Sequence, residues 1–263
     1  AAIADYTEAI KLAPQKDQAY INRGVAHSER EDHEAVIADF EAALKINPNN
    51  ERVKDVLQAT KEYRAAKKNY VAETDRRGKI SDDFLQQGNQ QFGQKKWNEA
   101  IPLYTKCIEA NPLNLDCFNY RGLAYGAIKE FDKAIADFSA ILLFKPVPKI
   151  YHRRALAHRD KNDLEAAIKD FTEAVRLAPQ DAENYAERGA TYFFKKDFAS
   201  ATGDLSQAIR LKPQEARYYF IRGYAYQAAG SRGSAIADYK KALQVDPNFA
   251  AAQKQLQTLG VQP

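Results

Sequence analysis

The chain has 263 residues, of which 45% are hydrophobic and 28% are charged, so it holds enough apolar material for a folded core and disorder of the whole chain is excluded. Its formal net charge is +4, with 39 Lys and Arg against 35 Asp and Glu, which is too small an excess to indicate a nucleic-acid-binding protein. No segment approaches the roughly 20 consecutive apolar residues of a membrane span, and direct membrane insertion is not expected.

The first segment already has a helical pattern. Residues 1–13 carry apolar side chains at helical spacing and are followed by Pro14, and the sequence contains no Met. We interpret the chain as starting in the middle of a repeat. The sequence therefore says nothing of a targeting segment and leaves the cellular compartment open, with the cytoplasm weakly favoured.

Prolines mark a repeat along the whole chain. Seven of the ten prolines are 33 or 34 residues apart, except for one gap of 64 residues between Pro48 and Pro112. These prolines are Pro14, Pro48, Pro112, Pro146, Pro179, Pro213 and Pro247. A fixed period of this length indicates a tandem array of one supersecondary unit.

Residue types recur at fixed distances before these prolines. An aromatic residue stands 28 positions before each proline after the first, a Gly or Ala stands 24 before it, and a large residue stands 8 before every proline. The small residues are Gly24, Gly88, Gly122, Ala155, Gly189 and Gly223, and the large residues are Tyr6, Phe40, Tyr104, Phe138, Phe171, Leu205 and Tyr239. Because small residues let two backbones approach closely, we expect the large side chains to pack on them.

Each unit is predicted to contain two helices. In the unit that ends at Pro146, the apolar residues Ile135, Phe138 and Ile141 recur at helical spacing. A turn such as residues 195–198 joins the first helix to the second. The proline then ends the unit, because its ring cannot continue a helix.

A 34-residue unit with an aromatic residue, Gly or Ala, then Ala, an aromatic residue, Ala and Pro resembles the tetratricopeptide repeat family. The resemblance covers nearly the whole chain, although Cys107 and Ile141 replace the small residue usual five positions before the proline. It implies an all-α fold, in which tandem helix-turn-helix repeats form a right-handed α-solenoid. It also implies a scaffold or adaptor that binds a protein or peptide in a concave groove, as co-chaperones of this family do.

The 64-residue gap holds one unit and about thirty further residues, roughly 50–80. One helical face of this segment is apolar and the opposite face is charged, as expected for a helix that caps an array. Its apolar residues are Val53, Val56, Leu57, Thr60, Tyr63 and Tyr70. The C-terminal residues Phe249, Ala252, Leu256 and Leu259 form a similar stripe, which ends at Gly260.

These caps predict two arrays. The first covers residues 1–70, with a half repeat, one full repeat and a capping helix. A charged joint follows at residues 71–80 and contains Gly78, and the second array covers residues 81–263, with five repeats and a C-terminal capping helix. The alternative is one continuous superhelix with an elongated inner helix.

The family resemblance implies that the first helix of each repeat lines the concave face. Residues at fixed positions on these helices therefore become candidates for a peptide-binding site. The candidates are Asn89, Asn119, Lys149, His152, Arg153, Arg159, Phe193, Phe220 and Tyr224. Phe193, Phe194, Phe220 and Tyr224 offer apolar contacts, although packing within the repeats is the stronger explanation for any one of them.

Lys149, Arg153 and Arg159 follow one another at helical spacing, where they could converge on an anion. The segment KIYHR, residues 149–153, and Asn89 after Gly88 resemble the carboxylate clamp by which some tetratricopeptide domains hold an acidic C-terminal peptide. The resemblance therefore implies a partner with an acidic C-terminus. The alternative is that these cations form a solvated helix face beside acidic neighbours.

The clamp pattern is incomplete. Leu85 stands where the clamp has a Lys, and Tyr120 stands where it has an Asn, although Asn119 is adjacent. Because Phe193, Phe194, Phe220 and Tyr224 are expected next to the basic residues, we expect a ligand segment that carries both acidic and apolar residues.

No catalytic, metal or cofactor site is expected. The four His residues do not converge, since His27 and His158 occupy positions that are Tyr in other units, and His33 falls in a predicted turn. Cys107 and Cys117 are the only cysteines, and we interpret both as buried small residues. A second hypothesis is a structural role, in which exposed array ends associate with another copy.

Overall fold

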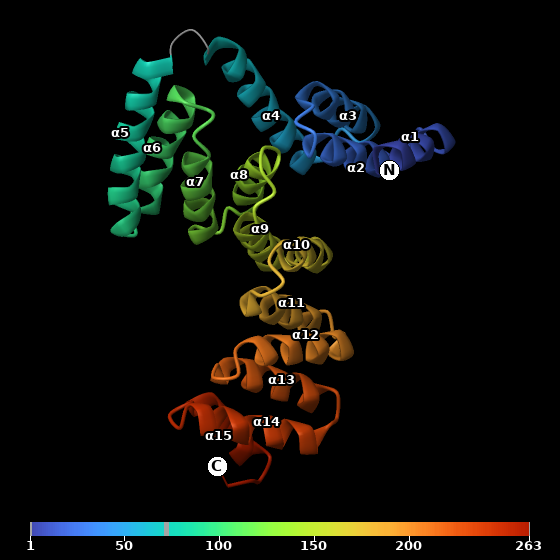
Figure 1. The fold of residues 1–263 in the computed structure, drawn as a ribbon, viewed down its shortest axis with the longest axis vertical. Coiled ribbons are helices and arrows are strands. Elements are labelled where there is room, and N and C mark those ends of the chain that lie inside the picture. Colours follow the sequence, from blue (N-terminus) through green and yellow to red (C-terminus); the bar gives the residue numbers. More distant parts are fainter. Residues whose placement is uncertain (1, 71–73, 263) are drawn as a thin grey trace. The chain divides into compact units, whose positions relative to one another are not determined.

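The computed structural model describes residues 2–70 and 74–262, and within these ranges it contains fifteen α-helices and no strand (Figure 1). The prediction of an all-α repeat fold is confirmed. The helices are α1 (Ala2–Leu12), α2 (Asp17–Ser28), α3 (His33–Ile46), α4 (Glu51–Tyr70), α5 (Thr74–Gly93), α6 (Trp97–Ala110), α7 (Leu115–Ala127), α8 (Phe131–Leu142), α9 (Pro148–Asp160), α10 (Leu164–Leu177), α11 (Ala182–Phe194), α12 (Phe198–Leu211), α13 (Ala216–Ala228), α14 (Arg232–Val245) and α15 (Ala250–Thr258).

The chain divides into two compact units, Ala1–Ala157 and His158–Pro263, and the boundary lies within α9. The first unit contains α1 to α8 and most of α9. The second contains the end of α9 and α10 to α15. Each unit is described separately below.

Consecutive helices pack as pairs because a glycine of the first helix lies on a large side chain of the second. The pairs α2–α3, α5–α6, α7–α8, α11–α12 and α13–α14 lie side by side. A Cβ atom at Gly122 would lie 2.9 Å from Cε1 of Phe138, and one at Gly223 would lie 2.9 Å from Cε1 of Tyr239. Any larger residue would push the helices apart, so the predicted pairing of small and large residues is confirmed.

The turn inside each pair has its own local cause. Lys196 adopts the left-handed conformation, with φ 64°, and reverses the chain after α11. The carboxylate of Asp197 then accepts a 3.1 Å hydrogen bond from the Ser200 amide and caps α12. The predicted turn at residues 195–198 is confirmed.

An arginine bridge joins successive repeats. Arg121 on α7 forms two hydrogen bonds with Asp137 on α8, at 2.9 and 2.7 Å, and a third with the Thr105 hydroxyl on α6, at 3.2 Å. The same three-residue bridge, of Arg, Asp and a hydroxyl residue, recurs as Arg23–Asp39–Thr7, Arg188–Asp204–Thr172 and Arg222–Asp238–Ser206. The recurring aspartates therefore serve the fold.

Helix α4 packs against both α3 and α8. Val53 and Leu57 are buried in a cluster with Leu143, which follows α8 directly, and the Tyr63 ring lies 3.5 Å, centroid to centroid, from the Phe144 ring. The predicted polar face of this capping helix is exposed at Arg52, Lys54 and Lys61, whereas its apolar residues Val53, Leu57 and Tyr63 are buried. His33, predicted to lie in a turn, is the first residue of α3 and is buried beside Tyr63.

The contact with α4 explains why the outer face of α8 is apolar. Ala140 and Leu143 are 2% and 5% exposed. The corresponding residues of α14, Lys241 and Gln244, are exposed. The first unit thus replaces polar side chains with apolar ones where α4 packs.

Residues 74–80 of the segment predicted as a joint belong to α5, and a Cβ atom at Gly78 would meet no other atom within 4 Å. Residues 71–73 and the side chain of Tyr70 lie outside the described part of the chain. At the other end, Ala252 and Leu256 of α15 are fully buried in a cluster with Tyr239 and Ala242, as the predicted apolar stripe requires.

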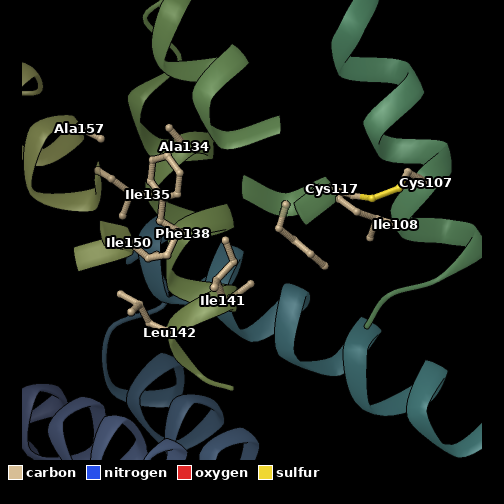
Figure 2. Packing of buried hydrophobic residues seen from close by; sticks show 12 residues of the cluster. Cys107, Ile108, Cys117, Ala134, Ile135, Phe138, Ile141, Leu142, Ile150 and Ala157 are labelled. Carbon is tan, nitrogen blue, oxygen red and sulfur yellow. A yellow bond between two sulfur atoms is a disulfide. The ribbon is translucent and has the colours of Figure 1, made fainter. Parts of the chain in front are cut away.

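Cys107 on α6 and Cys117 on α7 are both fully buried, as predicted, and form a disulfide across the two helices (Figure 2). Their Cα atoms are 6.1 Å apart. The sequence did not predict this bond, because two cysteines ten residues apart do not reveal whether their side chains meet across a turn.

Candidate functional site

The first unit carries two cations of α9 one helical turn apart. Lys149 is exposed, whereas Arg153 is half-buried and donates a hydrogen bond from Nη1 to Oδ1 of Asn119 on α7. Burial lowers the pKa of Arg153 from its ordinary value, and the nearby Tyr120 opposes this shift. Within residues 2–70 and 74–262, neither cation forms an ion pair with a carboxylate.

An aromatic cluster on α5, α6 and α7 includes Tyr120, which lies near enough to Arg153 to affect its pKa. Tyr120 on α7 stacks on Tyr104 with ring centroids 5.9 Å apart, and Phe92 meets the Tyr120 ring edge-on at 5.7 Å. The Tyr104 hydroxyl donates a 3.0 Å hydrogen bond to Oδ1 of Asn89. The positions that depart from the clamp pattern are thus apolar, since Leu85 is also partly buried against the core.

Asn89 and Asn119 both use their side-chain oxygens within the fold. The Oδ1 atom of Asn89 is used by Tyr104, and Asn119 orients Arg153. The amide Nδ2 groups of both side chains have no hydrogen bond with any described residue and are available as donors. His152, which stands between Lys149 and Arg153 in the sequence, is half-buried.

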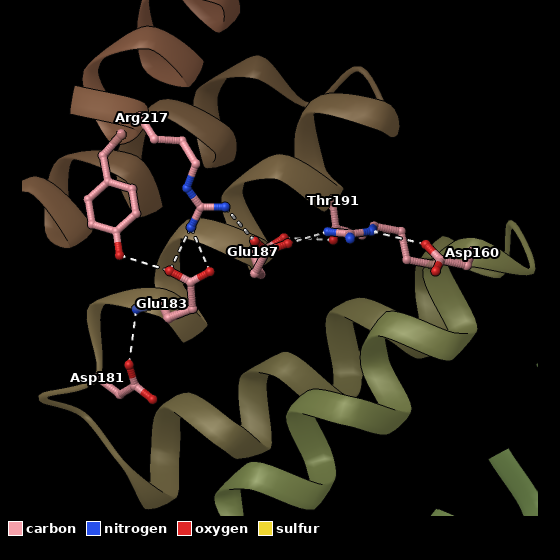
Figure 3. A network of polar contacts seen from close by, with 8 residues as sticks. Asp160, Asp181, Glu183, Glu187, Thr191 and Arg217 are labelled. Carbon is pink, nitrogen blue, oxygen red and sulfur yellow. Dashed lines mark hydrogen bonds and ion pairs between the residues drawn. The ribbon is translucent and has the colours of Figure 1, made fainter. Parts of the chain in front are cut away.

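In the second unit, the cations of the first helices are paired with carboxylates (Figure 3). Arg217 on α13 forms ion pairs with Glu183 at 2.6 Å and with Glu187 at 3.1 Å, both on α11. Glu187 also pairs with Arg159, and the Tyr218 hydroxyl donates a 3.0 Å hydrogen bond to Glu183. We call Arg159, Glu183, Glu187 and Arg217 the ion network.

The ion network fixes the charge of its members. Burial opposes ionisation of Glu183, but the hydrogen bonds from Arg217 and Tyr218 outweigh it, and its pKa lies below the ordinary value. Burial likewise opposes the charge on Arg217, but its two glutamate partners raise its pKa above the ordinary value. With two cations and two anions, the network leaves little net charge for a ligand.

The second unit also brings together the predicted aromatic residues. The Phe193 ring lies 5.3 Å from the Tyr224 ring, and the Tyr224 ring lies 6.2 Å from the Phe220 ring. Tyr224 is 42% exposed and the adjacent Phe194 is 59% exposed. Phe220 also packs against Phe249 at 5.3 Å, so it supports the fold as well as the surface.

Opposite charges one repeat apart were the signal that the sequence analysis missed. Glu183 and Arg217 hold the same position in successive repeats, 34 residues apart, and are in contact because residues one period apart lie side by side on stacked first helices. Arg153 contacts Asn119, which stands next to Tyr120, the residue one repeat before Arg153. Reading charges at this spacing would have predicted the Glu183–Arg217 pair.

No three His, Cys, Asp or Glu side chains come together as a possible metal site in the described residues. His158 is buried, and its two ring nitrogens lie 3.5 and 3.9 Å from carboxylate oxygens of Asp163 and Asp170. None of the helices of residues 2–70 and 74–262 has the length and hydrophobicity that crossing a bilayer requires.

Stacked helix pairs of one fixed period define a helical repeat protein. Family models of the tetratricopeptide repeat match residues 18–50, 85–149, 148–181 and 216–249. Since these matches cover most of the chain, the chain belongs to the tetratricopeptide repeat family, whose members are protein-interaction scaffolds.

Curated relatives share the repeats. The chain is 37% identical over 99 residues to RNA polymerase II-associated protein 3 of Rattus norvegicus, which is 37% of this chain and 15% of the relative. It is 32% identical over 106 residues to serine/threonine-protein phosphatase 5 of Homo sapiens, 40% of this chain and 21% of the relative. It is 33% identical over 110 residues to heat shock protein STI1 of Saccharomyces cerevisiae, 41% of this chain and 18% of the relative. The chain thus spans about a fifth or less of these proteins.

Solved structures share the fold. A crystal structure of MamA aligns with a TM-score of 0.58 and 26% identity, covering 62% of this chain and 96% of that one. The tetratricopeptide repeat protein YrrB aligns with a TM-score of 0.59 and 16% identity, covering 72% of this chain and 97% of that one. Both comparisons support the helical repeat architecture.

Proposed function

We propose that this chain is an adaptor that holds a partner protein by an acidic peptide segment, bound at Lys149 and Arg153. One observation carries the proposal: these two cations have no carboxylate partner among the described residues, whereas Arg159 and Arg217 are paired. An uncompensated guanidinium that is half-buried gains more from an arriving carboxylate than a fully solvated one.

The ligand supplies a carboxylate and an apolar side chain. The carboxylate pairs with Arg153, which Asn119 orients, and with the more exposed Lys149. Each charge-assisted hydrogen bond contributes roughly 1.5 to 3 kcal/mol when well ordered. The apolar side chain packs on an aromatic wall formed by Phe92 and by Tyr120, which stands where a complete clamp has an Asn.

The names of two relatives support a role beside chaperones. One is heat shock protein STI1, and another is the Hsp70-Hsp90 organizing protein of Triticum aestivum, which is 24% identical over 153 residues, 58% of this chain and 26% of the relative. A co-chaperone-like adaptor that receives an acidic chaperone C-terminus is therefore the partner class we favour.

The test is an array of acidic C-terminal peptides, each with a free or an amidated C-terminus. We expect binding that prefers the free carboxylate and falls at least tenfold in Lys149→Ala and Arg153→Ala. The matched control is Lys145→Ala, since Lys145 is also exposed but precedes α9. Equal binding of amidated peptides would assign the cations to an internal acidic side chain, and unchanged affinity in Arg153→Ala would refute the site.

A further inference from the structure

The disulfide between Cys107 and Cys117 lies one helical turn from the aromatic stack of the candidate site. Cys107 and Tyr104 are three residues apart on α6, and Cys117 and Tyr120 are three residues apart on α7, so each pair shares one face of its helix. The sulfur–sulfur bond and the Tyr104–Tyr120 stack, with ring centroids 5.9 Å apart, therefore join the same two helices at adjacent positions. A change at the cysteines is thus transmitted directly to the stack.

The stack in turn holds polar groups of the site. The Tyr104 hydroxyl donates a hydrogen bond to Asn89 at 3.0 Å, and Asn119, which precedes Tyr120 on α7, accepts the hydrogen bond of Arg153. The positions of both asparagines therefore depend on how α6 and α7 pack against each other.

Other repeats make the same helix contact without a disulfide. At this contact they have apolar residues, and the two members of each pair lie in one buried cluster. The pairs that correspond to Cys107 and Cys117 are Ile141 with Ile150, Ala208 with Tyr218, and Ala242 with Ala252. Because side chains that are not bonded suffice there, we expect the repeat to fold with the cysteines reduced as well as oxidised.

A buried hydroxyl lies beside one of the two sulfurs. Ser81 on α5 is fully buried, and its hydroxyl oxygen lies 3.2 Å from Sγ of Cys107. This oxygen accepts a 3.1 Å hydrogen bond from Nδ2 of Asn114, so its own proton can point to the sulfur. Since a hydrogen-bond donor stabilises a thiolate, Cys107 is the better leaving group when the disulfide is reduced.

We propose that Cys107 and Cys117 form a redox switch that sets the affinity of the peptide site, an inference that rests on the proposed function. The reductant is a dithiol, which supplies two electrons and two protons. Its first thiolate attacks Sγ of Cys117 and releases Cys107, and its second thiolate attacks the reductant's own sulfur and releases Cys117. Each released cysteine takes up a proton, and the reductant becomes a cyclic disulfide.

Reduction weakens the site because two thiols need more room than two bonded sulfurs. Both sulfurs are fully buried in a cluster with Ile108 and Phe138, where close packing leaves little free space (Figure 2). Reduction therefore moves α6 and α7 apart and loosens the stack of Tyr104 on Tyr120. The oxidised chain is the state that binds an acidic peptide more tightly.

The test compares the two redox states of the whole chain. Dithiothreitol reduces one sample until both cysteines react with a maleimide after denaturation. The acidic peptide that binds best in the peptide array is then titrated with each sample and followed by anisotropy. We expect the reduced chain to bind at least about fivefold more weakly, with unchanged helical circular dichroism. The chain has only these two cysteines, so the reductant acts through this pair.

The matched control replaces both cysteines by Ala, which is the pair that Ala242 and Ala252 form at the corresponding contact. This variant should bind the peptide equally well with and without dithiothreitol. A second readout follows from linkage, because saturating peptide should shift the thiol–disulfide equilibrium of the natural chain toward the disulfide by the same factor.

Equal affinities of the oxidised and reduced chains would overturn the switch and leave the proposed function intact. Loss of the helical signal on reduction would also overturn it, since the bond would then be structural. Absence of peptide binding in both states would refute the proposed function, and the switch with it.

Discussion

The two units use the same repeat in opposite ways. In the first unit, α4 covers the outer face of α8, while Lys149 and Arg153 on α9 have no carboxylate partner among the described residues. In the second unit, the outer residues Lys241 and Gln244 of α14 are exposed, while Arg217 is held by Glu183 and Glu187. The comparison teaches that the same repeat position can be covered, paired or left available to a ligand, depending on which side chains the neighbouring helices place beside it.

Lys149 and Arg217 make this point most directly, because both stand 30 residues before the proline that ends their repeat. Arg217 has Glu183 one repeat earlier and is paired with it. Lys149 has Asp116 one repeat earlier, yet both side chains are exposed and they form no ion pair. The residue type alone therefore does not decide whether a charge is available to a ligand.

The largest expected effect is on the covered face. Leu143→Glu would place a carboxylate in the apolar cluster with Val36 and Phe40, and we expect the free energy of unfolding of the first unit to fall by about 3 kcal/mol or more. Urea unfolding followed by Trp97 fluorescence, which reports on the first unit, measures the change. Gln244→Glu at the corresponding exposed position of α14 is the control and should shift stability by less than about 0.5 kcal/mol. Equal stability of both variants would mean that α4 does not pack on α8.

A smaller effect is expected when Arg153 in the first unit is given a carboxylate partner, as Arg217 has in the second unit. Tyr120 lies one repeat before Arg153, and Tyr120→Glu would supply the carboxylate that Arg153 lacks. We expect acidic peptides to bind about tenfold more weakly, or ~1.4 kcal/mol. Tyr120→Gln is the control, because it removes the same aromatic contacts without adding a charge. If both variants bind alike, the aromatic wall matters and the charge of Arg153 does not.

The converse change should make the cations of the second unit available to an acidic ligand. Glu187→Gln removes one partner of both Arg159 and Arg217. The change is made in the Arg153→Ala variant, in which the proposed site of the first unit no longer binds acidic peptides. We expect the double variant to bind acidic peptides several-fold more tightly than Arg153→Ala alone, measured by calorimetry. Glu173→Gln is the control, since Glu173 pairs only with Arg176 on the same helix. No gain would mean that the ion network is not what keeps ligands from these cations.

Much of the fold can be predicted from the sequence because the same packing of a small residue on a large one recurs in each repeat. Gly223 must lie on Tyr239 for the reason that Gly122 lies on Phe138, so one correct reading predicts the others. The packing of α4 on α8 was missed because it occurs once. Its signal was Leu143 at a position that is polar elsewhere, and only a comparison between repeats makes that visible.

The division into two arrays joined at residues 71–80 stays a prediction. Leu57 of α4 and Leu256 of α15 both replace the bridging Arg, and both are buried on the preceding pair. Gln87 in α5 also replaces that Arg, as expected for the first repeat of an array. The candidate site was less predictable, because the charge left on Arg153 depends on what its neighbours on other helices carry.

The smallest effect is a pH dependence of the ion network. Hydrogen bonds from Arg217 and Tyr218 lower the pKa of Glu183 in the folded state, against the opposing effect of burial. The stabilisation is therefore complete above the ordinary Glu pKa of about 4.3 and is lost as the pH falls through the lower folded-state pKa. Between about pH 5 and pH 3, the free energy of unfolding of the natural chain should fall more steeply than that of Glu183→Gln, measured by urea unfolding and circular dichroism. Parallel curves would mean that Glu183 is not held by Arg217 in solution, and the contrast with the unpaired Lys149 would then rest on the geometry of the helices rather than on charge.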